Sequence, residues 1–495
     1  MKRTALALVA ACFGLCGALP ASAAEGGATQ RTEIEAFGPN ALVLSDGTYW
    51  VWGGPQSVPT RVPGIEDAAV PLGDGLVRSE DGALYVVESD PYVIGPIEAT
   101  KIEGLRNVAF VYDYWDQWVA VDESGRAYLA RKAGGHVAAE QTMEAKVLGG
   151  LENVVDVATY DEVSDNGNVR NWAFLREDGT VLRSTNELTS FEPIPGLIGV
   201  VQLEDQLALQ SDGTVWRLTT EGDESRLPVR IAGLENIADI VSVGGSYAAI
   251  DESGRLYFWG ETRVGWSDGT IVHMHDEAVP LTGVQDVVDA WIAERTLLAL
   301  TADGDLFAAS ISVEQLPADV PFELLASDVE EMTGTSRHAI LQKKDGTLWG
   351  WGVNKGAALG LGDYEFMHDG VRPMQPPVSV VLNGETIALT TGVVIRNGQA
   401  FLPLRSVFER LGASPEWNAA ERTVTIERTA DGAEPVVIII DYDDGSVTVN
   451  GEAAALANDP FIIQSTSYLP LRFVSETLGA KVDWMQDARK IMITM

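Results

Sequence analysis

One short phrase ending in glycine recurs eight times between residues 45 and 346, and it constrains the fold more than any other feature. Asp-Gly between apolar runs favours a tight β-hairpin, because the turn needs a positive φ that glycine adopts without steric cost. Seven of the eight copies have an aromatic residue three positions after the glycine. The copies are Ser45-Asp46-Gly47, Glu80-Asp81-Gly82, Glu123-Ser124-Gly125, Glu177-Asp178-Gly179, Ser211-Asp212-Gly213, Glu252-Ser253-Gly254, Ala302-Asp303-Gly304 and Lys344-Asp345-Gly346.

A second phrase, glycine followed by an aliphatic residue, falls between consecutive hairpins. An example is Gly104-Leu105, and an aliphatic residue usually returns four positions after the glycine, as at Val108. Short strands repeating about every 40 residues are typical of propeller blades, whereas a helical solenoid would need amphipathic helices. We therefore expect a mainly β chain with a β-propeller of seven or eight blades over residues 31–370.

The last copy carries the most specific motif, Asp345-Gly346-Thr347-Leu348-Trp349-Gly350-Trp351-Gly352-Val353-Asn354, followed by Leu359-Gly360-Leu361-Gly362-Asp363. It resembles the regulator-of-chromosome-condensation repeat and its secreted bacterial relatives. Most middle copies lack the Trp-Gly-x-Asn tail, and the usual loop histidine is replaced, for example by Trp118 or Tyr247. A secreted relative inhibits β-lactamases through its loop face, so the resemblance implies a binding protein.

A proline-rich segment at 371–377 predicts a linker to a second domain. Residues 378–495 contain two segments that match without a gap at an offset of 67 residues. Pro403 and Pro470 are expected to delay a short helix until Ser406 and Ser475. The matching pieces are Asn383-Gly384-Glu385 with Asn450-Gly451-Glu452, Leu402-Pro403-Leu404-Arg405 with Leu469-Pro470-Leu471-Arg472, Leu411-Gly412-Ala413 with Leu478-Gly479-Ala480, and Trp417 with Trp484.

This duplicated α+β domain resembles the N-terminal stalk domain of copper amine oxidases. In those enzymes the copper and the modified tyrosine belong to a separate catalytic domain, which has no counterpart in this sequence. The resemblance therefore implies an accessory or wall-associated module without a cofactor.

The N-terminus is typical of an export signal. Lys2 and Arg3 precede an apolar run, and small residues suggest cleavage after Ala23, which gives a signal peptide over 1–23. Lipid attachment at Cys12 is the alternative. The only other cysteine, Cys16, also lies in this segment, so the mature chain would contain no thiol or disulfide.

The formal net charge of −38 disfavours nucleic acid and anionic membranes, whose recognition needs a basic surface. After the signal, no apolar stretch is long enough for a membrane span. The expected location is extracellular, in the medium or at the cell wall or cell surface.

Few residues suggest chemistry. His273 and His275 are two residues apart, so on a β-strand they would lie on the same face, as two metal ligands can. No third ligand is obvious, so we expect no metal site. Asp441-Tyr442-Asp443-Asp444-Gly445 lacks the later glutamate of a calcium loop and is interpreted as a hairpin turn. No catalytic motif is found, so we predict a protein that is not an enzyme.

Aromatic and acidic loops between the first and second strands of some repeats are the candidate ligand-binding elements. They supply Tyr114, Trp115, Tyr160 and Trp291, and equivalent loops of a propeller converge on one face. Such a patch suits an exported protein with a basic rim or a cell-wall sugar polymer. An equally weighted alternative is that Trp115 and Trp291 pack between blades. The competing functions are a secreted hydrolase that attacks wall polymer with channel carboxylates, and a structural surface-layer protein.

Overall fold

The computed structural model describes residues 32–495 except 74, 89–94, 96, 115–116, 132–144, 165–166, 186, 219–226, 266–269, 404–406, 430–434 and 465. Strands dominate both parts of the chain, as expected. The predicted signal peptide and Cys12 lie outside the described residues.

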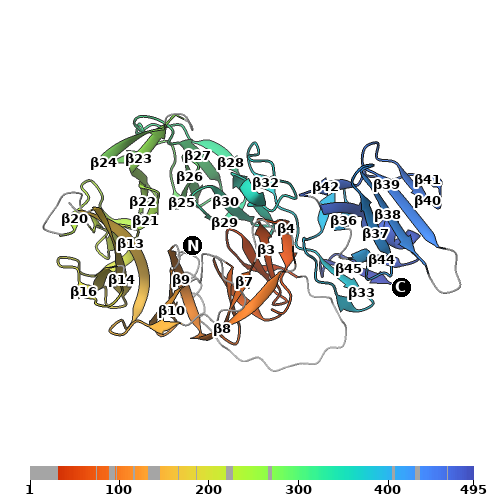
Figure 1. Ribbon diagram of the computed structural model, residues 1–495. Helices are drawn as coiled ribbons and strands as arrows, with labels where there is room; N and C mark the ends of the chain where they lie inside the picture. The colour runs from red at the N-terminus through yellow and green to blue at the C-terminus, as the bar shows by residue number, and fades with distance from the viewer. Residues whose placement is uncertain are drawn as a thin grey trace, which may run out of the picture.

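Residues 34–373 form eight four-stranded antiparallel sheets arranged in a ring (Figure 1). Each sheet is one blade, made of four consecutive strands, so the predicted propeller is confirmed and the blade number is eight. Blades 1 to 4 are β1 (Ile34–Phe37), β2 (Ala41–Leu44), β3 (Tyr49–Gly53), β4 (Gln56–Arg61); β5 (Ala68–Gly73), β6 (Leu76–Ser79), β7 (Ala83–Glu88), β8 (Glu98–Arg106); β9 (Val108–Tyr114), β10 (Gln117–Asp122), β11 (Ala127–Arg131), β12 (Lys146–Val147); and β13 (Val154–Ser164), β14 (Gly167–Arg176), β15 (Val181–Thr185), β16 (Glu192–Pro193).

Blades 5 to 8 continue the ring. They are β17 (Val200–Glu204), β18 (Leu207–Gln210), β19 (Val215–Arg217), β20 (Val229–Arg230); β21 (Ile237–Val243), β22 (Ser246–Asp251), β23 (Leu256–Val264), β24 (Ile271–Leu281); β25 (Val287–Ala293), β26 (Thr296–Thr301), β27 (Leu306–Ser310), β28 (Glu323–Ala326); and β29 (Val329–Gly334), β30 (His338–Lys343), β31 (Leu348–Gly352), β32 (Arg372–Pro373). A 3₁₀ turn, η2 (Lys355–Ala357), follows β31. Strand β32 lies inside the segment that the sequence suggested as a linker.

The repeated glycine phrase joins the second and third strands of every blade, and each of the eight glycines has a positive φ. In blade 1 the Asp46 carboxylate accepts hydrogen bonds from the backbone N–H and the hydroxyl of Thr48. The Thr48 hydroxyl in turn accepts a bond from Trp50 Nε1 at 2.9 Å. The same chain of bonds recurs in blades 5 and 8, and it accounts for the tryptophan three positions after the glycine in these three blades.

Each pair of neighbouring blades encloses an apolar cluster. The cluster between blades 3 and 4, for example, includes Val119 and Val121 from one sheet and Trp172 and Phe174 from the other. The eighth cluster packs Trp50 and Trp52 of blade 1 against blade 8 and so closes the ring. Burial of apolar side chains between blades is therefore the main favourable term that holds the sheets together.

The C-terminal domain consists of three sheets and one described α-helix around a single apolar core. Its elements are β33 (Ser379–Leu382), β34 (Glu385–Thr386), β35 (Val394–Arg396), β36 (Gln399–Pro403), β37 (Ser414–Asn418), β38 (Thr423–Arg428), β39 (Val436–Asp441), β40 (Val447–Val449), β41 (Glu452–Ala454), β42 (Phe461–Ile463), β43 (Thr466–Pro470), α3 (Leu471–Thr477), β44 (Lys481–Met485) and β45 (Lys490–Thr494). Asp441–Gly445 joins β39 to β40 and is the expected hairpin turn. The expected helix start at Ser475 is wrong: α3 begins at Leu471, because Pro470 occupies the N-cap, where a missing N–H costs nothing.

The two halves of this domain exchange their hairpins. The β37–β38 hairpin of the first half shares a sheet with β40–β41 of the second, and β44–β45 of the second shares a sheet with β33–β34 of the first. The middle sheet pairs β36 with the equivalent β43, with Leu402 opposite Leu469. The duplication seen in the sequence is therefore one interlocked domain.

Candidate binding surface

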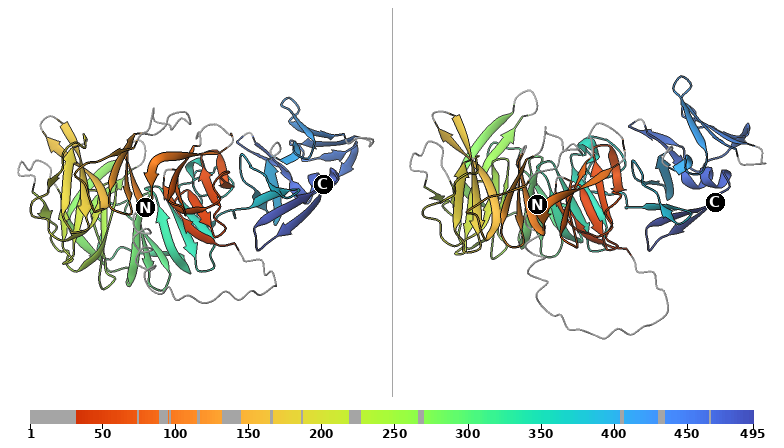
Figure 2. Two further views of the ribbon diagram at one scale, coloured as in Figure 1. Left: turned by 90° about the horizontal axis from the view of Figure 1, so that it is seen from below. Right: turned by 60° about the horizontal axis from the view of Figure 1, so that its bottom comes forward.

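The two faces of the propeller differ in the length of their connections. One face, here called the turn face, carries the eight tight glycine turns and the connections between blades. The other, the loop face, carries the turns between the first two and the last two strands of each blade. The lengthened hairpins β13–β14 and β23–β24 both project on the loop face (Figure 2). Added length is therefore concentrated where a partner could be contacted without disturbing the ring.

An aromatic cluster lies at the base of the β13–β14 hairpin, between blades 3 and 4. The fully buried Trp172 ring lies 5.7 Å from Tyr112 and 6.0 Å from Tyr114, both in edge-to-face geometry. The guanidinium of Arg170 lies over the Tyr114 ring at 4.6 Å, and its Nη2 is 2.6 Å from Asp161 Oδ2. This geometry holds the partly buried Tyr114 in one orientation and leaves the Arg170–Asp161 pair partly exposed.

The other predicted aromatic residues do not join this cluster. Tyr160 is 3% exposed and packs between blades 4 and 5. Trp291 is partly buried between blades 7 and 8, where its Nε1 donates to Thr335 O at 2.9 Å. Trp115 lies outside the described residues. The described aromatic side chains of the prediction are thus spread over three junctions, and ligand binding by them stays a prediction.

Trp172, Arg170 and Asp161 were not among the predicted ligand-binding residues. Asp161 and Arg170 lie opposite each other in the β13–β14 hairpin, whereas the contacts of Trp172 with Tyr112 and Tyr114 cross a blade junction, for which the sequence has no local signal. The length of the β13–β14 hairpin could have indicated this site. The hairpin contains more polar and charged residues than are needed to connect two strands by a tight turn.

The histidine pair lies on β24, and its two members have different surroundings. His275 Nε2 lies 2.8 Å from Glu314 O and 3.1 Å from Thr262 Oγ1. Within the described parts of the chain, no group of three or more His, Cys, Asp or Glu side chains is placed to hold a metal ion.

In several blades the third residue of the first strand, here called the inner strand, has a polar side chain. These side chains are called the polar belt below. Asp156 Oδ2 accepts from Leu203 N at 2.9 Å, and the Gln202 side chain bonds both Asp239 and the backbone of Ile240. These bonds join neighbouring blades, so the polar belt has a structural role there. Glu331 of blade 8 differs: burial, followed by the nearby carboxylates of Asp289 and Glu330, raises its pKa above the usual range.

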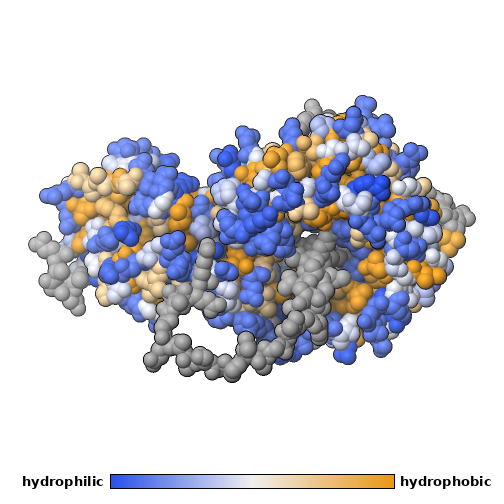
Figure 3. Space-filling model, turned by 180° about the vertical axis from the view of Figure 1, so that it is seen from behind, coloured by the Kyte–Doolittle hydropathy of each residue, from blue (hydrophilic) through white to orange (hydrophobic). Residues whose placement is uncertain are grey.

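The turn face presents exposed aliphatic residues beside the inner strands. Val201 and Val288 are 51% and 57% exposed, and each lies at a β-bulge at the start of its strand. Ile198, just before β17, is 82% exposed. Figure 3, which views the molecule from behind Figure 1, shows hydrophilic and apolar residues intermixed over both domains.

The fold defines the class of this chain: an eight-bladed β-propeller joined to a duplicated α+β domain. Residues 381–493 match the model of the copper amine oxidase N-terminal domain. This match confirms the predicted resemblance for that domain. It concerns only the N-terminal domain of the oxidases and assigns no oxidase reaction.

The chain is also similar to other known proteins. The ultraviolet-B receptor UVR8 of Arabidopsis thaliana is 30% identical over 156 residues, which are 28% of this chain and 35% of the receptor. The chain thus matches about a third of that relative's length. Human WBSCR16 is 15% identical, with a TM-score of 0.42 over 61% of this chain and 93% of that chain. Prp20p of Saccharomyces cerevisiae is 15% identical, with a TM-score of 0.40 over 70% and 87% of the two chains.

The architecture of both parts fits a protein-binding role.

In the part of the chain that the structure describes, no helix is long and apolar enough to cross a membrane.

Proposed function

We propose that this chain is an exported binding protein that recognises a protein partner with the loop face of its propeller. The observation that carries the proposal is the asymmetry of the two faces. The lengthened hairpins are on the loop face, whereas the turns of the opposite face are short and, in seven blades, hydrogen-bonded to the next blade. Loops on a rigid scaffold are the usual place for recognition, because they can vary without loss of the core.

The chemistry of the loop face supports a protein partner. The Tyr114 and Arg170 side chains are held by neighbours before any ligand arrives, so little side-chain entropy would be lost on binding. Tyrosine and arginine are also enriched among residues that dominate protein interfaces. The β23–β24 hairpin adds the exposed Ile271, Val272 and Met274, which are 57%, 48% and 57% exposed. The net charge of −38 favours a partner with a basic surface.

The test is affinity capture with the purified full-length protein from culture supernatant and from a cell-wall extract. The wild type is compared with the double variant Tyr114→Ser/Arg170→Ser. The proposal expects at least one protein that the wild type retains and the double variant loses, and the recovered protein is then titrated against both forms to measure Kd.

Ile198→Ser is the matched control, since Ile198 is highly exposed on the opposite face. It should leave capture unchanged. Capture that survives the loop-face double variant and is lost in the Ile198 variant would overturn the assignment of the binding face. Retention of wall polysaccharide without any protein would instead identify a glycan ligand.

Glu331 supports a second candidate function, a hydrolase of wall polymer. Its raised pKa and the proximity of Asp289 are features that an acid–base pair needs. The discriminating measurement is release of soluble fragments from purified cell wall by the wild type and by Glu331→Gln. Fragment release by the wild type that Glu331→Gln abolishes would show that the chain is an enzyme.

A further inference from the structure

Seven of the eight blade junctions share one backbone hydrogen bond on the turn face. The carbonyl oxygen of the hairpin glycine in one blade accepts from an N–H at the start of the next blade's inner strand. The donors and acceptors are Ala68 and Gly47, Asn107 and Gly82, Val154 and Gly125, Val200 and Gly179, Ile237 and Gly213, Val287 and Gly254, and Val329 and Gly304, at distances from 2.8 to 3.1 Å.

The junction between blade 8 and blade 1 is different. Among the described residues, Gly346, the hairpin glycine of blade 8, makes no such bond to blade 1. A Cβ placed on Gly346 would have no described atom within 4 Å, whereas one on Gly125 would lie 2.6 Å from Asn153 Cα of the next blade. This junction therefore lacks the contact that fixes the other seven on the turn face.

On the loop face the same junction is closed by the segment that follows β31. Trp52 Nε1 of blade 1 donates to Ala358 O at 2.9 Å, and Gly54 N donates to Gly356 O at 2.7 Å. Gly362 N donates to Ser57 O at 2.9 Å. The specific motif of the last repeat, which most middle repeats lack, thus spans the junction between blade 8 and blade 1, here called the seam.

The C-terminal domain contacts both sides of this seam. On the blade 1 side, Thr32 N donates to Asp487 O at 2.8 Å and Gln56 Nε2 donates to Thr390 O at 3.3 Å. On the blade 8 side, Gln375 is the link: its Oε1 accepts from Ile395 N at 2.8 Å.

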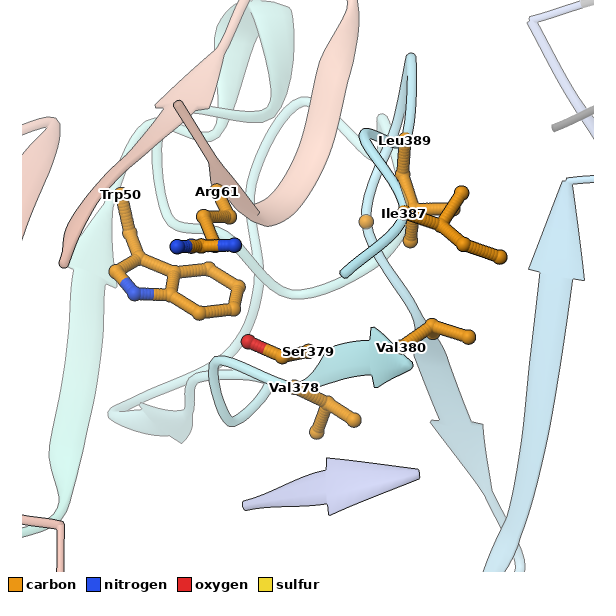
Figure 4. A pocket seen from close by; sticks show the side chains of 8 residues that line it. Trp50, Arg61, Val378, Ser379, Val380, Ile387 and Leu389 are labelled. Carbon is orange, nitrogen blue, oxygen red and sulfur yellow. The ribbon is translucent and has the colours of Figure 1, made fainter. Parts of the chain in front are cut away.

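An apolar contact accompanies these hydrogen bonds. Val58 of β4 forms a cluster with Val394, Phe401 and Tyr468 of the C-terminal domain, and each of the four is at most 1% exposed. Gly392 allows the close approach, because a Cβ there would lie 2.5 Å from Pro59 O. Beside this cluster, Trp50 and Arg61 of blade 1 face residues of the C-terminal domain across a small cavity (Figure 4).

We propose that the duplicated domain is a clasp that keeps the propeller ring closed at its one irregular junction. Its contacts to blade 1 and to Gln375, which follows β32, compensate for the missing turn-to-strand hydrogen bond. Undocking of the C-terminal domain then raises the opening rate of the junction between blades 8 and 1, while the other junctions stay closed.

Hydrogen exchange of the full-length protein followed by mass spectrometry tests the clasp. Gly392→Val places a side chain against Pro59 O and should undock the domain. In both variants undocking is scored by faster exchange of the Thr32 amide, which donates to Asp487 O of the C-terminal domain. The expected result is exchange at least about tenfold faster in peptides of β2–β4 and β29–β31, with unchanged exchange in β17–β19 of blade 5. Gly149→Val is the control, since a Cβ on Gly149 meets no described atom within 4 Å.

A second variant covers the case in which Gly392→Val does not fold. Gln375→Ala removes the side-chain link to Ile395 without adding bulk. Its expected effect is smaller and in the same peptides. If either variant undocks the C-terminal domain while exchange in blades 1 and 8 stays at the wild-type rate, the domain is not a clasp. Uniform acceleration in all eight blades would also overturn the proposal.

Discussion

Trp52 Nε1 lies 2.9 Å from the carbonyl oxygen of Ala358, although 306 residues separate them in the chain. This hydrogen bond joins the first blade to the segment that follows the third strand of the last one. Among the described strands, none is shared between the first and last blades, so closure of the propeller depends on contacts such as this one between the two ends of the repeat array.

Trp52→Phe tests this contact. The variant keeps an aromatic ring in the cluster but leaves Ala358 O without its donor, so we expect a loss of about 1–3 kcal/mol in the free energy of unfolding. Equilibrium urea unfolding followed by circular dichroism measures it. Trp349→Phe is the control, because Trp349 Nε1 bonds Thr347 within its own exposed turn and the change should cost less. Equal losses would contradict a special role for the seam.

Asp251 gives a pH-dependent prediction. Burial opposes its ionisation, but hydrogen bonds from Ser253 and Arg255 outweigh burial and hold the pKa of this carboxyl below its usual value. A depressed folded pKa stabilises the fold above the unfolded pKa of about 3.9, and this stabilisation is lost as the pH falls through the folded pKa. Asp251→Asn should cost about 1–3 kcal/mol at pH 7.

The difference in unfolding free energy between wild type and Asp251→Asn should shrink as the pH falls below about 4 and through the lowered pKa of the folded Asp251, since the protonated carboxyl is then uncharged like the asparagine amide. Urea unfolding at a series of pH values measures it. Glu252→Gln, at the neighbouring exposed position, should show no comparable pH dependence. A difference that stays constant down to pH 2 would contradict the assigned role of the carboxylate.

Trp172→Ala should destabilise the propeller by about 3–5 kcal/mol, because it removes a fully buried ring from the junction of blades 3 and 4. Tyr114→Ala, at the partly exposed edge of the same cluster, should cost less. Thermal unfolding of both variants provides the comparison. If the order were reversed, Tyr114 would be a core residue and a poor choice for a binding surface.

The exchanged hairpins predict that half of the C-terminal domain cannot fold alone. A fragment of residues 378–428 leaves β37–β38 without β39–β41 and β33–β34 without β44–β45. We expect a disordered fragment by circular dichroism and amide nuclear magnetic resonance. Mixing it with residues 429–495 should restore strand signal if the two halves can reassociate. An independently folded 378–428 fragment would contradict the exchanged pairing.

The sequence alone determined the parts of this protein that depend on local interactions. A glycine turn needs only its neighbours, so the eight hairpins, the propeller class and the duplication could be predicted from residues such as Gly346 and the Leu402/Leu469 match. Val407, Phe408 and Leu411 have the spacing of one helix face, and all three are buried in the core of the C-terminal domain.

Only the tertiary structure showed which residues, far apart in the chain, contact each of these elements. Tyr160 and Trp291 belong to similar loops in the sequence, yet the neighbouring blade buries one and half-buries the other. Neither the seam at Trp52 and Ala358 nor the exchange of hairpins has a local signal, because each joins residues far apart in the chain. Such contacts arise from burial of apolar surface between complete sheets, and only the folded ring and the docked C-terminal domain bring those surfaces together.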